Sequence, residues 1–375
     1  MVTNAMGRVK VGVIGAGTIA QVEHVPNLLR LSDKFELAGV FDPSASTRAF
    51  MAKTHGIKTF ASADEILGQA LDAVVIASPD ALHKEHVIAA LERNLHVFCE
   101  KPLCYSTEDI ADIIRARDVA ARVVQVGYMK RFDPAYEALL ARLPPSPEKL
   151  RHVSVEVVDA DAWPFVLHHR THKADDISQA LRDDARQKQQ AQVRQALGVL
   201  PSEPSWRGFT SAYCSSLVHD VNAVHGILQA LGVSQQRVVS AEYFANGNGG
   251  HGCVSLMDGQ ALWSMSHLSI ATLPYYSERI SLHFDDMDCE LAFPSPYLNH
   301  QSTRLTVRKR DGNNLVTEHV HAGYKEAFIE ELVGFWSAVV EGTSVRNTAE
   351  HAAQDMALLC ALAKWQANST SRAIS

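Results

Sequence analysis

The stretch "RVKVGVIGAGTIAQVEHVPNLLRL", residues 8–31, decides the fold class. A β-branched apolar run comes first, glycines follow, and apolar residues then recur at helical spacing, so the stretch predicts a strand, a tight turn and a helix. Continuous apolar strands that alternate with amphipathic helices indicate an α/β domain with a parallel sheet covered on both faces. Further strands are predicted at 35–42, 72–79, 95–101 and 122–128, and helices at 43–55, 62–70, 82–94 and 106–121.

The turn in this stretch carries a G-x-G-x-x-A pattern, formed by Gly15, Gly17 and Ala20. In a dinucleotide-binding turn the first glycine makes the tight bend, the second lets the backbone approach a pyrophosphate, and the small third residue lets the helix pack closely on the sheet. The amino end of the helix attracts the phosphate charge. We therefore predict a dinucleotide site here, with Thr18 and Ile19 also in contact. The alternative is an ordinary strand-to-helix turn.

Asp42 ends the second predicted strand, 22 residues after Ala20. A carboxylate there can accept hydrogen bonds from the ribose hydroxyls and would repel a 2′-phosphate, so NAD(H) is expected rather than NADP(H). Arg48 leaves NADP(H) as a second option. The other interpretation of the segment "DPS", residues 42–44, is a turn or a helix cap that binds no ligand.

After Tyr128 the pattern changes to short strand-like segments joined by turns, which predicts an α+β domain with a mostly antiparallel open sheet. We expect a Rossmann domain at 1–127 and a substrate-binding and oligomerisation domain at 128–375. The Gln-rich stretch at about 168–206 has too few apolar positions for a core helix. It is therefore an insertion on the surface, over the cleft or against another subunit. The last helix is a candidate to pack back on the first domain.

Composition limits the class of protein. The chain has 375 residues, of which 46% are hydrophobic and 21% charged, as in a globular protein of two domains. A net charge of −7 and the lack of a long basic cluster argue against nucleic acid or an anionic membrane as partner. No apolar run suggests a membrane helix or a leader, and the six cysteines form no CxxC pair. We expect a cytoplasmic protein with free thiols and a small-molecule partner.

Four segments together resemble a known family: "GVIGAGTIA", "SPDALHKEHVIAALERNLHVFCEKPL", "VGYMKRFDPAY" and "EAFIEELVGFWSAVVEGTSVRNTAEHAAQDMALLCAL". They are similar to the glucose-fructose oxidoreductase, inositol dehydrogenase and rhizopine-catabolism (Gfo/Idh/MocA) family. The resemblance implies a Rossmann domain, nicotinamide-dependent redox chemistry on sugars, cyclitols or related polyols, and a homodimer or homotetramer formed through the open sheet. It also adds expected cofactor contacts at Ser78, Pro79, His83, Glu100 and Lys101.

Lys101 follows a predicted buried strand and is the middle residue of a Glu-Lys-Pro triplet, residues 100–102. The resemblance places the lysine of this triplet beside the nicotinamide and the substrate. Oxidation of an alcohol needs a hydrogen-bonding group at the reacting oxygen, and a desolvated lysine can serve as acid or base. We therefore expect Lys101 to be catalytic and to bind substrate. The alternative is a solvated lysine at a strand end.

The second half of the family site departs from the expected pattern. Many dehydrogenases that the chain resembles carry an Asp-x-x-x-His pair on one face of a helix. In "SSLVHDVN" His219 matches the histidine, but Ser215 stands at the aspartate position and Asp220 points elsewhere. We expect His219 to act as general acid/base, with Ser215 at the substrate. The alternative is a histidine that only packs.

Other candidates come from "GYMKRFDP", where Tyr128 and Arg131 are expected at the substrate; the alternative for Arg131 is an interdomain ion pair. No metal is expected, because the histidines lack ligand partners at recognisable spacing. Three functions remain open: a sugar or cyclitol dehydrogenase, an NAD-dependent glycoside hydrolase, and a noncatalytic dinucleotide-binding regulator.

Overall fold

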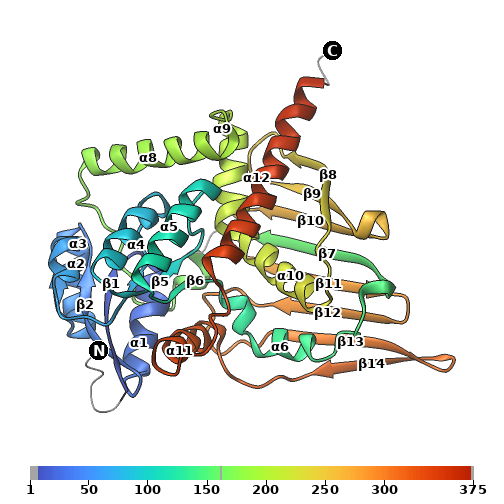
Figure 1. Ribbon diagram of the computed structural model, residues 1–375, viewed down its shortest axis with the longest axis horizontal. Helices are drawn as coiled ribbons and strands as arrows, with labels where there is room; N and C mark the ends of the chain where they lie inside the picture. Colours follow the sequence, from blue (N-terminus) through green and yellow to red (C-terminus); the bar gives the residue numbers. More distant parts are fainter. Residues whose placement is uncertain (1–6, 161–162, 373–375) are drawn as a thin grey trace. The chain divides into compact units, whose positions relative to one another are not determined.

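The computed structural model describes residues 7–160 and 163–372 and divides the chain into two compact units (Figure 1). The first unit contains the chain up to Tyr128 together with Val166–Gly198 and Phe328–Gln354. The second contains Met129–Phe165, Val199–Ala327 and the chain from Asp355 onward. This division differs from the predicted continuous domains 1–127 and 128–375.

The division differs because segments from late in the sequence pack into the hydrophobic core of the first unit. Leu332 and Phe335 of α11 (Ala327–Val340) are fully buried in the hydrophobic cluster of the first unit. The insertion has only Val193 and Ala196 buried in its helix α8 (Gln179–Leu197), so it cannot form a core of its own. It packs instead on the first unit. A single domain boundary at residue 127 cannot describe a unit that includes such later segments of the chain.

A parallel six-stranded sheet with strand order β3-β2-β1-β4-β5-β6 forms the first unit, which confirms the predicted Rossmann-type domain. On one face, side chains from β1 and β4 pack under α1, α2 and α11. Gly12 lies on the opposite face, where a Cβ would meet Ile66 of α3 at 2.9 Å. The strands are β1 (Val9–Ile14), β2 (Phe35–Phe41), β3 (Thr59–Phe60), β4 (Ala73–Ile76), β5 (His96–Glu100) and β6 (Val124–Gly127). The helices are η1 (Ala20–His24), α1 (Val25–Arg30), α2 (Ala45–His55), α3 (Ala63–Leu67), η2 (Asp80–Leu82), α4 (His83–Glu92) and α5 (Thr107–Ala120).

The second unit contains an eight-stranded sheet of order β14-β13-β12-β11-β7-β10-β9-β8. Its pairs are antiparallel except β10 with β7, so the predicted mostly antiparallel sheet is confirmed. The strands are β7 (Leu150–Asp159), β8 (Gln236–Tyr243), β9 (Gly249–Leu256), β10 (Ala261–Ser269), β11 (Ser277–Phe284), β12 (Met287–Phe293), β13 (Arg304–Asp311) and β14 (Asn314–Val320). The helical segments are η3 (Met129–Phe132), α6 (Pro134–Leu140), η4 (Pro147–Lys149), α9 (Glu203–Arg207), η5 (Gly208–Leu217), α10 (Val218–Ala230) and η6 (Met257–Gly259). The residues of α7 (Trp163–Val166) and of α12 (Ala349–Arg372) are divided between the two units.

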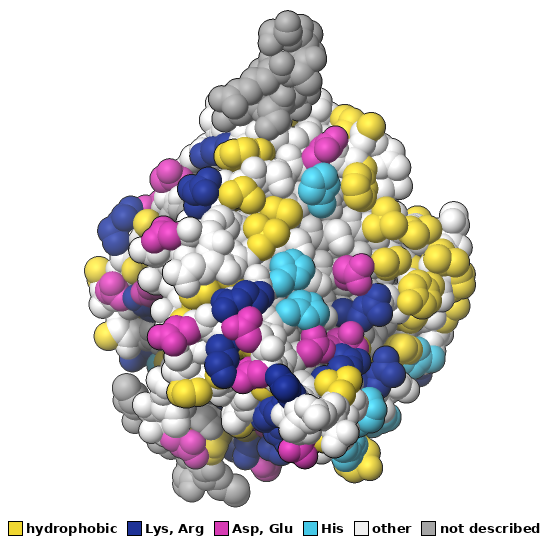
Figure 2. Space-filling view, turned by 90° about the vertical axis from the view of Figure 1, so that its right-hand side faces the viewer, with side chains coloured by type: hydrophobic (Ala, Val, Ile, Leu, Met, Phe, Trp, Pro, Cys, Tyr) yellow, Lys and Arg dark blue, Asp and Glu magenta, His cyan; other side chains and the backbone are white. Residues whose placement is uncertain are grey.

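One face of this sheet is much less buried than the other. Along β10, buried Trp263 and Met265 alternate with more exposed positions, which include Leu262 at 39% and Leu268 at 36% exposure. This alternation is typical of a sheet with one face toward a core. In the view of Figure 2, hydrophobic side chains gather toward the upper part and the right edge, and most charged side chains lie in the central and lower part.

Two sequence expectations concern the chain as a whole. The six cysteines are free thiols, as predicted. Among the described residues no helix is both long enough and apolar enough to cross a membrane. Residues 1–6, on which the expected lack of a leader partly depends, lie outside the described residues.

Candidate functional site

The carboxyl edge of the first sheet gathers most of the predicted cofactor residues. Ile14, Ile76 and Cys99 lie at the same level on β1, β4 and β5. The residues that follow these strands therefore emerge side by side: the glycine turn, the Ser78–Pro79 segment and the Glu100–Lys101 pair. The strand order reverses direction between β1 and β4, and ligands of such open sheets bind at the carboxyl end of that switch point.

The glycine turn has the geometry that a phosphate cradle requires. Gly15 has a φ of +95°, and a Cβ there would lie 2.5 Å from the carbonyl oxygen of Ala77, so only glycine fits. At Gly17 a Cβ would have no neighbour within 4 Å, which leaves open space above the exposed turn at Thr18. The helical segment η1 then starts at Ala20. The turn thus fits a dinucleotide pyrophosphate.

Asp42 holds this turn and the next one together. Its Oδ2 accepts a hydrogen bond of 2.9 Å from the backbone N–H of Ala16, and its Oδ1 accepts one of 2.9 Å from that of Ser44. Arg48 Nη1 donates to the carbonyl oxygens of Asp42 and Pro43, at 2.7 and 3.0 Å. The carboxylate is therefore fixed beside the glycine turn, and each oxygen keeps a lone pair for a further donor.

His83 links two turns at the carboxyl edge. Its ring is buried, with Nδ1 2.8 Å from the carbonyl oxygen of Pro102 and Nε2 2.9 Å from that of Ser78. Carbonyl oxygens only accept, so His83 serves both partners at once only when both ring nitrogens carry protons. These contacts indicate that His83 positions the turn after Lys101. Nearby, burial lowers the pKa of His86 to about 4, so its neutral ring can accept from the Ser78 hydroxyl at 2.9 Å.

Glu100 anchors the Glu-Lys-Pro triplet from inside. The carboxylate is buried, accepts a hydrogen bond of 2.7 Å from His24 Nε2 and one of 3.1 Å from the backbone N–H of Lys101. Burial pushes the pKa of Glu100 upward, but the hydrogen bond and charge of His24, together with Lys101, outweigh it and leave that pKa below its usual value. Lys101 itself is half-buried, and its peptide bond to Pro102 is cis.

Glu331 of α11 completes a buried group with His24 and Glu100, whose ligand-type atoms all lie within 4.8 Å of one another. Burial raises the pKa of Glu331 well above its usual value, and the charges of Glu100 and Glu23 add to the effect. The neutral acid that results is a poor metal ligand, and the His24–Glu100 hydrogen bond already uses two of the atoms. The group is therefore better suited to hold a proton than a cation.

Helix α8 of the insertion lies along the turns at this same edge. Gln192 Nε2 donates to the carbonyl oxygen of Ala81 at 2.9 Å, and Gln189 Nε2 donates to the Tyr105 hydroxyl at 2.8 Å. That hydroxyl in turn donates to Asp80 at 2.7 Å. The insertion was expected on the surface, over the cleft or against another subunit. These contacts place α8 above the turns that border the cofactor edge.

In the second unit, Ser215 and His219 lie on one continuous helical run of two types. Ser215 is exposed on η5, which is a π-helix, and His219 is half-buried in the first turn of α10. The helical run that carries both residues begins at Gly208 as a π-helix. A π-helix has more residues per turn than an α-helix, so the angular offset between these two side chains differs from that expected at an i, i+4 spacing.

Tyr128 and Arg131 are both buried. Asn347 Nδ2 donates to the carbonyl oxygen of Tyr128 at 2.8 Å within the first unit. In the second unit, Arg131 donates from Nε and Nη2 to the carbonyl oxygen of Asn222, at 2.9 and 2.7 Å. These bonds tie η3 to α10, and they give Arg131 a role in packing in addition to the predicted contact with substrate.

Sequence reasoning missed a buried ionic cluster behind α10. Lys130 Nζ lies 2.7 Å from Asp220 and also contacts Glu278, which accepts from the Tyr276 hydroxyl at 2.8 Å. Burial opposes the charge on Lys130, but the two carboxylates raise its pKa. Burial and the negative charge of Glu278 raise the pKa of Asp220 well above its usual value. The cluster thus pairs one buried lysine with two buried acidic side chains. The signal was present in Asp220, which follows His219 and points inward.

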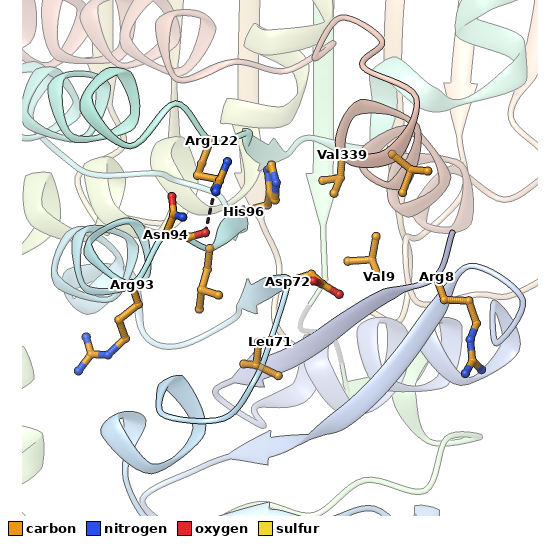
Figure 3. A pocket seen from close by; sticks show the side chains of 11 residues that line it. Arg8, Val9, Leu71, Asp72, Arg93, Asn94, His96, Arg122 and Val339 are labelled. Atoms are coloured by element: carbon orange, nitrogen blue, oxygen red, sulfur yellow. Dashed lines mark hydrogen bonds between the residues drawn. The ribbon is translucent and has the colours of Figure 1, made fainter. Parts of the chain in front are cut away.

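A separate cavity of about 260 Å³ lies at the opposite, amino edge of the first sheet (Figure 3). It is lined by the starts of β1 and β5, by Asp72 and by Val339 of α11. Arg122 Nε donates to the carbonyl oxygen of Asn94 at 2.8 Å. Arg93, which also lines the cavity, forms an ion pair with Asp64. Because the predicted dinucleotide site lies at the carboxyl edge, this cavity is not part of it.

Comparison with known proteins agrees with this geometry. Residues 9–128 match the model of an oxidoreductase family with an NAD-binding Rossmann fold. Inositol 2-dehydrogenase 3 of Saccharopolyspora erythraea is 41% identical over 133 residues, which cover 35% of this chain and 39% of that protein. Glucose-6-phosphate 3-dehydrogenase of Bacillus subtilis is 40% identical over 114 residues, 30% of this chain and 31% of that protein. The chain thus spans less than half of the length of these relatives.

Solved structures resemble the whole chain in fold. The UDP-N-acetylglucosamine 3-dehydrogenase of Acidithiobacillus ferrooxidans superposes with a TM-score of 0.68 at 18% identity, covering 96% of this chain and 98% of that one. At this identity the likeness concerns the fold alone. The sequence match, the fold and the glycine turn lead to one conclusion: residues 9–128 of this chain resemble the Gfo/Idh/MocA family of oxidoreductases.

Proposed function

We propose that the protein is an NAD(H)-dependent oxidoreductase that transfers a hydride between nicotinamide and a hydroxyl or carbonyl group of a sugar, cyclitol or related polyol. The observation that carries the proposal is the glycine turn, with Asp42 bonded to its backbone, at the sheet edge where Lys101 also emerges. The names of the relatives, which act on inositol and a sugar phosphate, support this class of substrate.

Each residue at this edge has a distinct part in the proposal. The turn from Gly15 to Ala20 holds the pyrophosphate, and Asp42 accepts hydrogen bonds from the adenosine ribose. The bound nicotinamide supplies hydride acceptance and donation. Lys101 holds the proton of the reacting hydroxyl at its Nζ, and His219 of the second unit is a second candidate for proton transfer. Glu100 and His83 position the turn that carries Lys101.

The test is to measure NADH binding by fluorescence titration and then to follow NADH absorbance with NAD and a panel of polyols and aldoses. Saturable binding with turnover of at least one polyol or sugar is the expected result. Release of an aglycone without net NADH formation would instead select the glycoside hydrolase. Binding with no turnover anywhere in a broad panel would select the regulator, and no binding of either dinucleotide would overturn all three.

We also propose that the second unit forms a homodimer or homotetramer through the less buried face of its sheet. Leu262 and Leu268 project on this face, beside an ion pair between Glu156 and Arg279 at 3.0 Å. Apolar residues rimmed by charged pairs are common where two copies of a chain meet.

A further inference from the structure

The segment before α8 contacts the corner between β2 and α2, and this contact is specific. Gln21 Nε2 donates to the carbonyl oxygen of His172 at 2.9 Å, and Gln21 Oε1 accepts from the His172 N–H at 2.7 Å. The His172 ring stacks on Phe50 at 5.6 Å between centroids, and its Nε2 lies 2.9 Å from the Ser46 hydroxyl. Both the backbone and the ring of His172 are thus fixed to the first unit.

This attachment places Asp176 at the start of α2. Its carboxylate accepts from the Ser44 hydroxyl at 2.5 Å, and from the backbone N–H and hydroxyl of Ser46, both at 3.0 Å. Asp175 adds a contact of 3.3 Å to the same hydroxyl. The helix does not need Asp176 for its cap, because Ser44 Oγ already accepts from the Thr47 N–H.

Ser44 lies between two carboxylates. Its backbone N–H donates to Asp42, and its hydroxyl donates to Asp176. Asp42 is the proposed partner of the ribose hydroxyls, so a phosphate on the ribose 2′-oxygen would have to lie near these same donors. Serine hydroxyls and the N–H groups of a helix start are the donors that phosphates use. Here they already hold an anion from the chain itself.

We propose that Asp176 acts as an internal anion at the position of a 2′-phosphate and so makes the site selective for NAD(H) against NADP(H). The inference rests on the proposed dinucleotide function and extends it to a residue of the insertion. Hydrogen bonds from Ser44 and Ser46 hold the pKa of Asp176 well below its usual value, so the carboxylate is ionised at neutral pH. A dianionic phosphate would both lose its donors and meet like charges. Arg48 provides positive charge at this corner, and its Nη1 is bonded to two backbone carbonyl oxygens.

The test compares dissociation constants for NADH and NADPH in the full chain and its variants. In Asp176→Ser and Asp176→Asn, affinity for NADPH should rise by about 10-fold or more while affinity for NADH stays within about 2-fold, because a single like charge is removed. Asp176→Glu should keep the preference for NADH. Adding Arg48→Ala to Asp176→Ser should cancel the gain. Asp183→Asn, which removes one charge from α8, is the matched control and should change neither constant.

The possible outcomes separate this inference from the proposed function. NADH binding with unchanged NADPH affinity in both Asp176 variants would overturn the inference alone. An equal change in both affinities would do the same, since it would show that Asp176 only fastens the insertion. No binding of either nucleotide to the unaltered protein would overturn the proposed function and the inference with it.

Discussion

His24 Nε2 donates a hydrogen bond of 2.7 Å to Glu100 Oε1, and both side chains are buried beneath the turn that carries Lys101. The interaction lowers the pKa of Glu100 below the unfolded value of 4.5. A carboxyl group with a depressed folded pKa contributes stability above its unfolded pKa and loses it as the pH falls through the folded one.

Glu100→Gln should therefore destabilise the chain at neutral pH by about 1–3 kcal/mol, the usual range for a buried charged hydrogen bond. The difference from the unaltered protein should shrink as the pH falls below 4.5. Urea unfolding at several pH values measures both effects. A constant difference across the whole range would show that the charge of Glu100 is not involved.

Glu331→Gln should have the opposite pH dependence. The folded pKa of Glu331 is raised above 4.5, so its contribution is complete below that value and declines as the pH rises through the folded pKa. Glutamine cannot ionise, so the variant should be the more stable form by at least about 1 kcal/mol near pH 8, with little difference in acid. Thermal unfolding at both pH values is the measurement. Glu341→Gln, at an exposed position just after α11, is the control and should show no such trend.

Lys101→Ala should lower turnover by about 100-fold or more while NADH affinity changes little, because it removes the group that is proposed to act at the reacting oxygen and leaves the glycine turn intact. His219→Ala should cause a smaller or comparable loss. If both groups act on one proton, the double variant should lose less than the product of the single losses. Unaltered turnover in a folded Lys101→Ala protein would return Lys101 to the role of a strand-end lysine.

Asp42→Ser should weaken the proposed preference for NADH over NADPH, because it removes the carboxylate that is proposed to bind the ribose. Asp42 also accepts from Ala16 and Ser44, so a loss of thermal stability is expected as well. Fluorescence titration with both nucleotides decides the outcome. Equal affinities already in the unaltered protein would contradict the role given to Asp42.

Leu262→Glu combined with Leu268→Glu should shift the protein toward the monomer, because both side chains lie on the less buried face of the second sheet. Light scattering at several concentrations measures the change. Val119→Glu, at a position 90% exposed on the first unit, is the matched control. A monomer in all three proteins would remove the sheet as an interface.

The periodic parts of the fold could be predicted from sequence, and the long-range attachments could not. Apolar runs and glycine spacing were sufficient for the first sheet, since β2 was predicted at 35–42 and is found at Phe35–Phe41. The two-residue strand β3 has too few residues for a pattern. The attachment of Asp176 to Ser44 joins positions 132 residues apart, and nothing local in either segment indicates its partner.

The return of the chain to the first unit has a consequence for synthesis at the ribosome. The segment that matches the family ends at residue 128, yet Leu332 and Phe335 belong to the core of the same unit. A nascent chain that has emerged only to residue 128 would therefore expose part of the apolar face of its first sheet. We expect that face to need shelter, by a chaperone or by the ribosome, until α11 has been translated.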